Sequence, residues 1–174
     1  MDETARAFIV IARSLLTGEY LPKIELCLER LSDEEVWWRA NAESNSIGNL
    51  LLHLSGNARQ WIVCGVGGKV DERERQQEFD ERAHLPREEL LARLRQTLAE
   101  VDDTLACFET EHILEHRQIQ GCGVSVLEAI FHVVEHFSMH TGQIILLTKA
   151  LKSVDLKFYE FAEDGAVSLR LSGR

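Results

Sequence analysis

Apolar residues recur at helical spacing along nearly the whole chain, and this pattern restricts the fold more than any other feature of the sequence. The long segments repeat apolar side chains at positions i, i+3, i+4 and i+7, whereas strands would alternate apolar and polar residues. The chain contains only two prolines, Pro22 and Pro86. Each amphipathic segment must bury its apolar stripe against another, so the sequence predicts an all-α fold.

Four long amphipathic helices are expected. They cover residues 8–31, 46–66, 86–108 and 124–152. The first is expected to break or kink near Gly18 and Pro22, which leaves either one bent helix or two collinear pieces. Four helices of this length imply an antiparallel-type four-helix bundle, formed by one domain that spans residues 1–174.

Two segments depart from the helical pattern. Residues 70–84 are dense in charge and contain one aromatic residue, which favours a solvated connection rather than a packed element. The tail, residues 154–174, mixes Phe158, Tyr159 and Phe161 with polar residues. It is expected to form an irregular or short extended segment that folds over the bundle.

The charge balance argues against two classes of partner. The 174 residues include 19 Lys and Arg against 29 Asp and Glu, a formal net charge of -10. Such a charge repels phosphate backbones and anionic lipid, so neither nucleic acid nor a membrane surface is an expected partner. The sequence has no apolar run of about 18 residues and no signal-peptide pattern at its start, so a cytoplasmic location is expected.

Histidines recur every four residues in the last predicted helix, at His132, His136 and His140. Positions i and i+4 differ by about 40° around a helix and about 6 Å along it, so two imidazoles there can bind one cation. The HExxH metalloprotease motif uses the same spacing, but Phe137 stands where that motif has its glutamate base. Pairs at this spacing also arise by chance, and a lone histidine usually hydrogen-bonds locally.

The positions of the histidines relative to the apolar stripes favour a metal site over chance. By helical-wheel angle, His136 and His140 flank the apolar stripe of the last helix. His53 flanks the stripe of the second helix, with Asn49 and Asn57 one turn away on either side. Both sets therefore point toward the bundle interior, and His53 offers a third ligand from a facing helix.

Two segments resemble a known family. Residues 47–61, which include His53, and the H-x3-H-T-G-Q-I motif of residues 136–144 resemble the DinB-like superfamily of metal-binding four-helix bundles. Residues 128–149 resemble an uncharacterised bacterial subfamily within it. The resemblance covers about residues 5–151 and implies an all-α DinB/YfiT-like four-helix bundle with a short irregular C-terminal tail.

The resemblance also implies a metal site and an assembly. The ligands would be His53, His136 and His140. The ion would be one divalent metal per chain, such as zinc, nickel or iron, with water in its open positions. The resemblance further implies a homodimer.

Neighbouring polar residues are candidates for supporting roles. Glu128 lies about 120° from His140 around the helix, so the two cannot share one metal ion. His132 is expected beside the site, where it exchanges a proton with metal-bound water while Glu128 orients it; the alternative is a hydrogen bond to nearby backbone or an adjacent carboxylate. Gln143 is expected to contact the outer nitrogen of a metal-bound imidazole, and Asn57 to line the site.

The expected donor set indicates a reaction type. Three neutral imidazoles leave a divalent ion its full charge and an open position, which lowers the pKa of bound water. The family that the chain resembles includes thiol transferases and hydrolases. We therefore expect a metal-dependent enzyme that activates water or a low-molecular-weight thiol, with His132 or Glu128 as its proton partner. The alternative is a non-catalytic metal-binding or dimeric scaffold protein, of a stress-related type.

Overall fold

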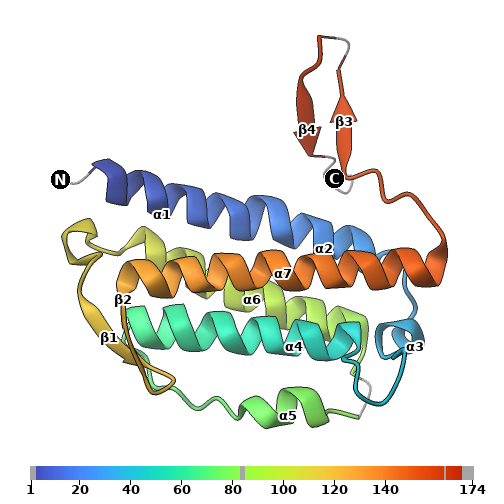
Figure 1. The fold of residues 1–174 in the computed structure, drawn as a ribbon, viewed down its shortest axis with the longest axis horizontal. Helices are drawn as coiled ribbons and strands as arrows, with labels where there is room; N and C mark the ends of the chain where they lie inside the picture. The colour runs from blue at the N-terminus through green and yellow to red at the C-terminus, as the bar shows by residue number, and fades with distance from the viewer. Residues whose placement is uncertain (1–2, 83–84, 163, 170–174) are drawn as a thin grey trace.

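Four helical rods lie side by side in the computed structural model, which describes residues 3–82, 85–162 and 164–169 (Figure 1). The rods consist of α1 (Glu3–Leu15), η1 (Leu16–Tyr20) and α2 (Leu21–Leu28); α4 (Ile47–Ala58) and η2 (Arg59–Val66); α6 (Arg87–Ala106); and α7 (Val126–Lys152). The first rod and α7 run in one direction, and the α4 rod and α6 run in the other (Figure 1). A short helix, α3 (Asp33–Val36), connects the first two rods. The structure confirms the predicted helical bundle.

The first rod remains continuous through Pro22. A proline inside a helix lacks an N–H group, and its ring crowds the carbonyl four residues earlier. The π-helical turn η1 precedes α2 here, and a wider turn of this kind relieves the crowding. The rod therefore consists of two collinear α-helical pieces joined by η1, which is one of the two expected forms.

The chain returns from the end of η2 to the start of α6 along the outside of α4 (Figure 1). We call residues 70–82 of this return the strap. It contains α5 (Arg75–Asp80), which packs against α4. The expected solvated connection over residues 70–84 holds for most of the strap, whose residues are largely exposed, but the side chains of Arg73 and Glu78 pack against α4 and are nearly buried. Residues 83–84 lie outside the described residues.

Two short antiparallel hairpins depart from the helical pattern. Their strands are β1 (His116–Ile119), β2 (Cys122–Ser125), β3 (Tyr159–Phe161) and β4 (Val167–Leu169). The first hairpin follows η3 (Thr110–His112) and turns at Gly121, whose φ of 79° suits glycine. The second lies in the tail and projects away from the bundle (Figure 1). The tail is extended, as one alternative stated, and it folds over the bundle only in its first part, where Leu156 is buried in the core and the Tyr159 hydroxyl accepts a hydrogen bond of 2.7 Å from Nζ of Lys23.

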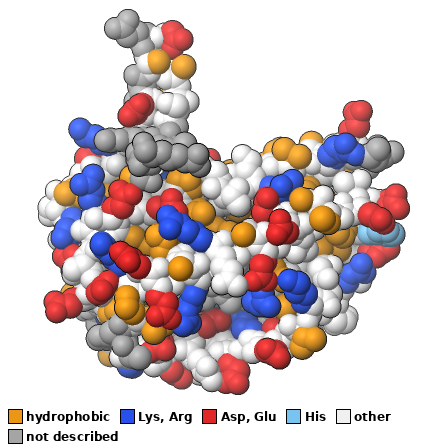
Figure 2. Space-filling view, turned by 180° about the vertical axis from the view of Figure 1, so that it is seen from behind, with side chains coloured by type: hydrophobic (Ala, Val, Ile, Leu, Met, Phe, Trp, Pro, Cys, Tyr) orange, Lys and Arg blue, Asp and Glu red, His pale blue; other side chains and the backbone are white. Residues whose placement is uncertain are grey.

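The apolar stripes of the four rods form one core. Large, almost fully buried side chains come from every rod: Leu16, Ile24, Leu51, Leu54, Ile62, Leu90, Leu94, Leu98 and Phe137. The outer faces are charged, and Figure 2 shows acidic and basic side chains interspersed over one side of the molecule. Among the described residues, no helix has the length and apolar character needed to cross a bilayer.

Candidate metal centre

Three histidine side chains from two rods point at one another inside the bundle. His53 lies on α4, whereas His136 and His140 lie one turn apart on α7. The Nε2 atom of His136 is 3.1 Å from that of His53 and 2.9 Å from that of His140. The three residues are 6%, 8% and 9% exposed, in chain order. The structure thus brings together the three histidines that the sequence singles out, which we call the triad.

Local sequence sets the direction of each histidine. α4 begins at a capping box in which Ser46 and Asn49 each accept a hydrogen bond from the other's backbone N–H. Phe137, between the two histidines of α7, is fully buried in the core and fixes the rotation of that helix. His136 and His140 therefore face α4 from the edge of the apolar stripe.

The outer nitrogens of two rings contact oxygen acceptors. Nδ1 of His140 lies 2.6 Å from Oε1 of Gln143, and Nδ1 of His53 lies 2.9 Å from the carboxylate Oε2 of Glu78. These oxygens accept, which favours a proton on Nδ1 of each ring and leaves the lone pair of Nε2 facing the centre. At His53 the same Nδ1 also lies 3.2 Å from Nη2 of Arg73. Gln143 thus lies where the sequence interpretation puts it, on the outer nitrogen of a triad imidazole.

Burial keeps two rings of the triad, those of His136 and His140, uncharged. The pKa of His136 is lowered to about 3, first by burial and then by the neighbouring His140. Burial also lowers the pKa of His140 below its ordinary value. Neutral imidazole is the form of histidine that coordinates a metal, so His136 and His140 are in the ligand form at neutral pH.

The donor set fits a divalent cation. Nε2 of His136 faces the Nε2 atoms of His53 and His140. Without a cation, a proton on Nε2 of His136 can form a good hydrogen bond to only one of these two atoms. Nδ1 of the same ring is then a buried acceptor, and it has no hydrogen-bond partner among the described residues. A cation at the common point satisfies all three lone pairs at once. In a tetrahedral site with bonds of about 2.0–2.1 Å, ligand nitrogens lie about 3.3 Å apart, close to the separations within the triad.

His132 lies one turn before His136 and outside the triad. Its ring stacks on that of His136 at a centroid distance of 5.3 Å and contacts that of Trp61 at 4.1 Å. Nδ2 of Asn57 donates a hydrogen bond of 3.2 Å to Nε2 of His132. In the part of the chain that the structure describes, Oδ1 of Asn57 and Nε1 of Trp61 are buried without a partner. The local partner of His132 is therefore an amide on the facing helix.

Glu128 is held at the start of α7, away from His132. Its Oε2 accepts hydrogen bonds of 2.7 Å from the backbone N–H and from the hydroxyl of Ser125. The same hydroxyl accepts from the backbone N–H of Glu128, and these contacts lower the pKa of the Glu128 carboxyl. The expectation that Glu128 orients His132 is corrected, because a serine and a glutamate three residues apart form a capping box here.

The strap contributes a buried ion pair that the sequence pattern does not indicate. Nε and Nη2 of Arg73 donate to the two carboxylate oxygens of Glu78 over 2.6 and 2.8 Å. Burial acts to raise the pKa of Glu78, but hydrogen bonds from Arg73 and His53 outweigh it and hold that pKa below its ordinary value. The one sequence signal of this packing is Phe79, the single aromatic residue of the strap, whose ring lies 4.8 Å from that of His53.

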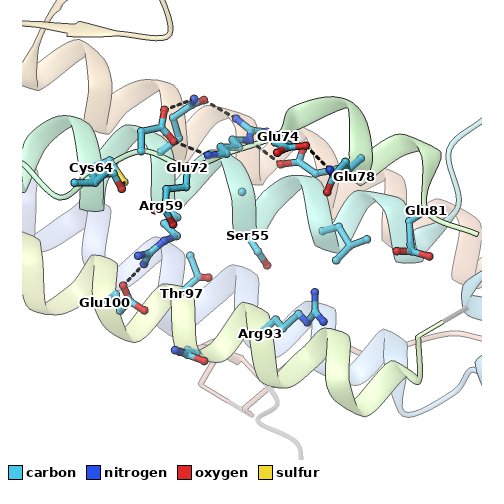
Figure 3. A pocket seen from close by; sticks show the side chains of 18 residues that line it. Ser55, Arg59, Cys64, Glu72, Glu74, Glu78, Glu81, Arg93, Thr97 and Glu100 are labelled. Atoms are coloured by element: carbon cyan, nitrogen blue, oxygen red, sulfur yellow. Dashed lines mark hydrogen bonds and ion pairs between the residues drawn. The ribbon is translucent and has the colours of Figure 1, made fainter. Parts of the chain in front are cut away.

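A cavity of about 500 Å³ lies between the strap, the α4 rod and α6 (Figure 3). Its wall includes Arg73 and Glu78 on the strap side, and Ser55, Arg93 and Thr97 on the helices (Figure 3). The triad is not part of this wall. The Arg73–Glu78 pair therefore separates the cavity from the triad, because it lines the cavity and contacts the triad through Glu78.

A second group of potential ligands lies nearer the surface. Glu109, Glu111 and His112, around η3, place ligand atoms within 4.8 Å of one another. The two carboxylates are exposed, and the carboxylate of Glu115 raises the pKa of His112. A raised pKa favours the protonated imidazole, which is not a ligand. The buried triad is therefore the stronger candidate.

The helical bundle has the fold of a DinB-like protein whose structure is known. The chain belongs to a family of proteins of unknown function (DUF1572), whose sequence profile matches residues 3–164. The crystal structure of a DinB-like protein from Bacillus cereus ATCC 10987 is similar, with a TM-score of 0.60 and 16% sequence identity over 78% of this chain and 90% of that chain. At this identity the likeness shows the fold alone. No protein with a curated description matches the sequence.

Proposed function

We propose that His53, His136 and His140 hold one divalent metal ion and that the protein is a metal-dependent enzyme acting on water or a low-molecular-weight thiol. The observation that supports this most strongly is the convergence of three Nε2 atoms in a buried setting. When bound there, a divalent ion supplies Lewis acidity and lowers the pKa of a coordinated water or thiol. The reaction is hydrolysis or S-transfer of the thiol to an electrophile, and zinc, nickel or iron suits imidazole ligands.

Other residues of the chain prepare this chemistry. Gln143 and Glu78 fix the Nδ1–H form of two ligand rings. Phe79 packs against the ring of His53 and excludes water from that side. Burial lowers the pKa of His132, so this residue is neutral at neutral pH. It is the proposed proton acceptor, one turn from the ligands, when its Nε2 releases the amide of Asn57.

Metal content, measured by elemental mass spectrometry on untagged protein, tests the centre. The parent is expected to hold about one ion per chain, whereas His53→Ala, His136→Ala and His140→Ala lose it because two imidazoles bind weakly. His132→Ala is the control inside the bundle, and His112→Ala is the control at the surface. A parent that stays free of metal after reconstitution, or a triad variant that retains the metal, overturns the proposal.

A second candidate function is that of a metal-binding or dimeric scaffold without turnover. It is favoured by the burial of the triad and by its separation from the cavity. Cobalt(II)-loaded protein distinguishes the two functions, because a thiol such as glutathione that reaches the ion adds a sulfur-to-metal charge-transfer band. Absence of the band at saturating thiol supports the scaffold. The homodimer stays a prediction, which sedimentation equilibrium tests.

A further inference from the structure

We propose that Arg73, Glu78 and Gly56 together position His53 for metal binding, so that the strap controls the affinity of the centre. The inference rests on the proposed metal site and adds a device outside its three ligands. Arg73 and Glu78 lie on the strap, and Gly56 lies on α4 one turn after His53. These residues act through His53 and are positioning residues.

Both carboxylate oxygens of Glu78 are engaged. Oε1 accepts from Nε of Arg73 over 2.6 Å, and Oε2 accepts from Nη2 of Arg73 over 2.8 Å and from Nδ1 of His53 over 2.9 Å. The carboxylate is therefore held away from the ligand positions and faces the outer nitrogen of His53, which Nη2 of Arg73 also approaches to 3.2 Å. A carboxylate in this place fixes the ring and makes its other nitrogen a stronger donor, and its loss typically weakens metal binding about 10–100-fold.

The pair is buried and fastened to α4 at more than one point. The side chains of Arg73 and Glu78 are 6% and 11% exposed. Nη1 of Arg73 donates to Oε1 of Gln60 over 2.8 Å, and Nε2 of Gln60 donates to Asp71 over 2.7 Å. An exposed ion pair of long side chains contributes little order, whereas breaking a buried one leaves an uncompensated charge. The strap is thus tied to the helix that carries His53.

Gly56 makes the room in which the pair docks. A Cβ atom at this position would lie 2.0 Å from Oε1 of Glu78 and 2.8 Å from Nε of Arg73. Glycine in a helix interior destabilises the helix relative to alanine, so its presence in α4 matches the close approach of the strap. Gly142 of α7 is different, because nothing lies within 4 Å of a Cβ built there.

Zinc affinity, measured by competition with a chromophoric chelator, tests the inference. Glu78→Ala and Gly56→Ala are expected to weaken zinc binding about 10–100-fold. Their matched controls are Glu74→Ala, which removes an exposed carboxylate of the same strap, and Gly142→Ala, which adds a methyl group in open space. Both controls are expected to bind zinc as the parent does. Circular dichroism and cooperative thermal unfolding of metal-free Gly56→Ala are expected to show a folded helical protein, since alanine favours helix, which separates positioning from unfolding.

The protonation of the His53 ring provides a second readout that needs no metal. NMR of the imidazole nitrogens in the metal-free parent is expected to show Nδ1–H alone, whereas Glu78→Ala and Gly56→Ala should show a mixture with Nε2–H. Equal zinc affinity in the parent and every variant would overturn the inference and leave the metal centre intact. A parent that binds no zinc would overturn the proposed function. The NMR spectra would then still test the positioning of His53: a mixture of Nδ1–H and Nε2–H forms in the variants would support it, and Nδ1–H alone in every variant would overturn it.

Discussion

Asn57 on α4 and His132 on α7 are joined by a hydrogen bond of 3.2 Å from Nδ2 to Nε2, one helical turn from the triad. The bond engages the Nε2 atom that a metal would require. It explains why a histidine at the same four-residue spacing as the two ligands of α7 stays outside the ligand set. The residue on the facing helix therefore decides whether a histidine of α7 joins the ligand set: His132 faces an asparagine, whereas His136 faces a histidine.

Replacing His132 with alanine is therefore expected to leave the metal content unchanged. The change deprives the buried amide of Asn57 of its partner, so the free energy of unfolding should fall by about 1–3 kcal/mol. Urea unfolding and elemental analysis of one preparation measure both quantities. Loss of the metal would show instead that His132 is a ligand.

Zinc is expected to stabilise the fold only while the triad is complete. A ligand that binds the folded state alone adds about 2.7 kcal/mol to the free energy of unfolding when present at about 100 times its dissociation constant. The parent should therefore resist urea better with excess zinc, whereas His140→Ala should not respond. Equal stabilisation of both proteins would place the bound zinc elsewhere, and His112→Ala would then test the group around η3.

The metal-free protein is expected to lose stability as the pH falls below 6.5, the ordinary pKa of histidine. The pKa of His136 is about 3 in the folded state, so between these values the unfolded chain binds a proton that the folded chain does not. The stabilising contribution is complete above the higher value and is lost toward the lower one, by up to about 1.4 kcal/mol per pH unit. Urea unfolding of chelator-treated protein across this range measures the slope. His136→Gln should reduce it, and an unchanged slope in that variant would contradict the assignment.

Glu128→Ala is expected to destabilise α7 without altering metal binding. The variant loses one half of the capping box with Ser125, which should lower the free energy of unfolding by about 1 kcal/mol. Thermal unfolding measures the loss, and Ser138→Ala, on the exposed face of the same helix, is the control. A metal affinity that fell in Glu128→Ala alone would restore the role that the sequence first suggests.

The apolar period predicts the triad because it fixes the rotation of each helix. Once Phe137 faces the core, His136 and His140 at the edge of the stripe must face a neighbouring rod, and the same argument directs His53 from the other side. Packing thus turns a pattern of local residues into a contact between distant segments.

The strap follows no such rule. Arg73 and Glu78 lie in a charged segment without an apolar stripe, and their place depends on the space above Gly56 and on Gln60, features of an already folded α4 rod. Glu128 fails as a prediction for a different reason. Its spacing from Ser125 fits a capping box, and only the observed start of α7 decides in favour of the cap.

The triad joins residues that are far apart in the chain, since 83 positions separate His53 from His136. During synthesis a ribosome releases α4 long before α7, so the growing chain offers a lone imidazole, which binds metal weakly. In the proposed centre, loading must therefore wait until the last rod has emerged and docked. The supply of metal in the cell would then act on finished molecules, and a shortage would leave folded, empty protein instead of stalled chains.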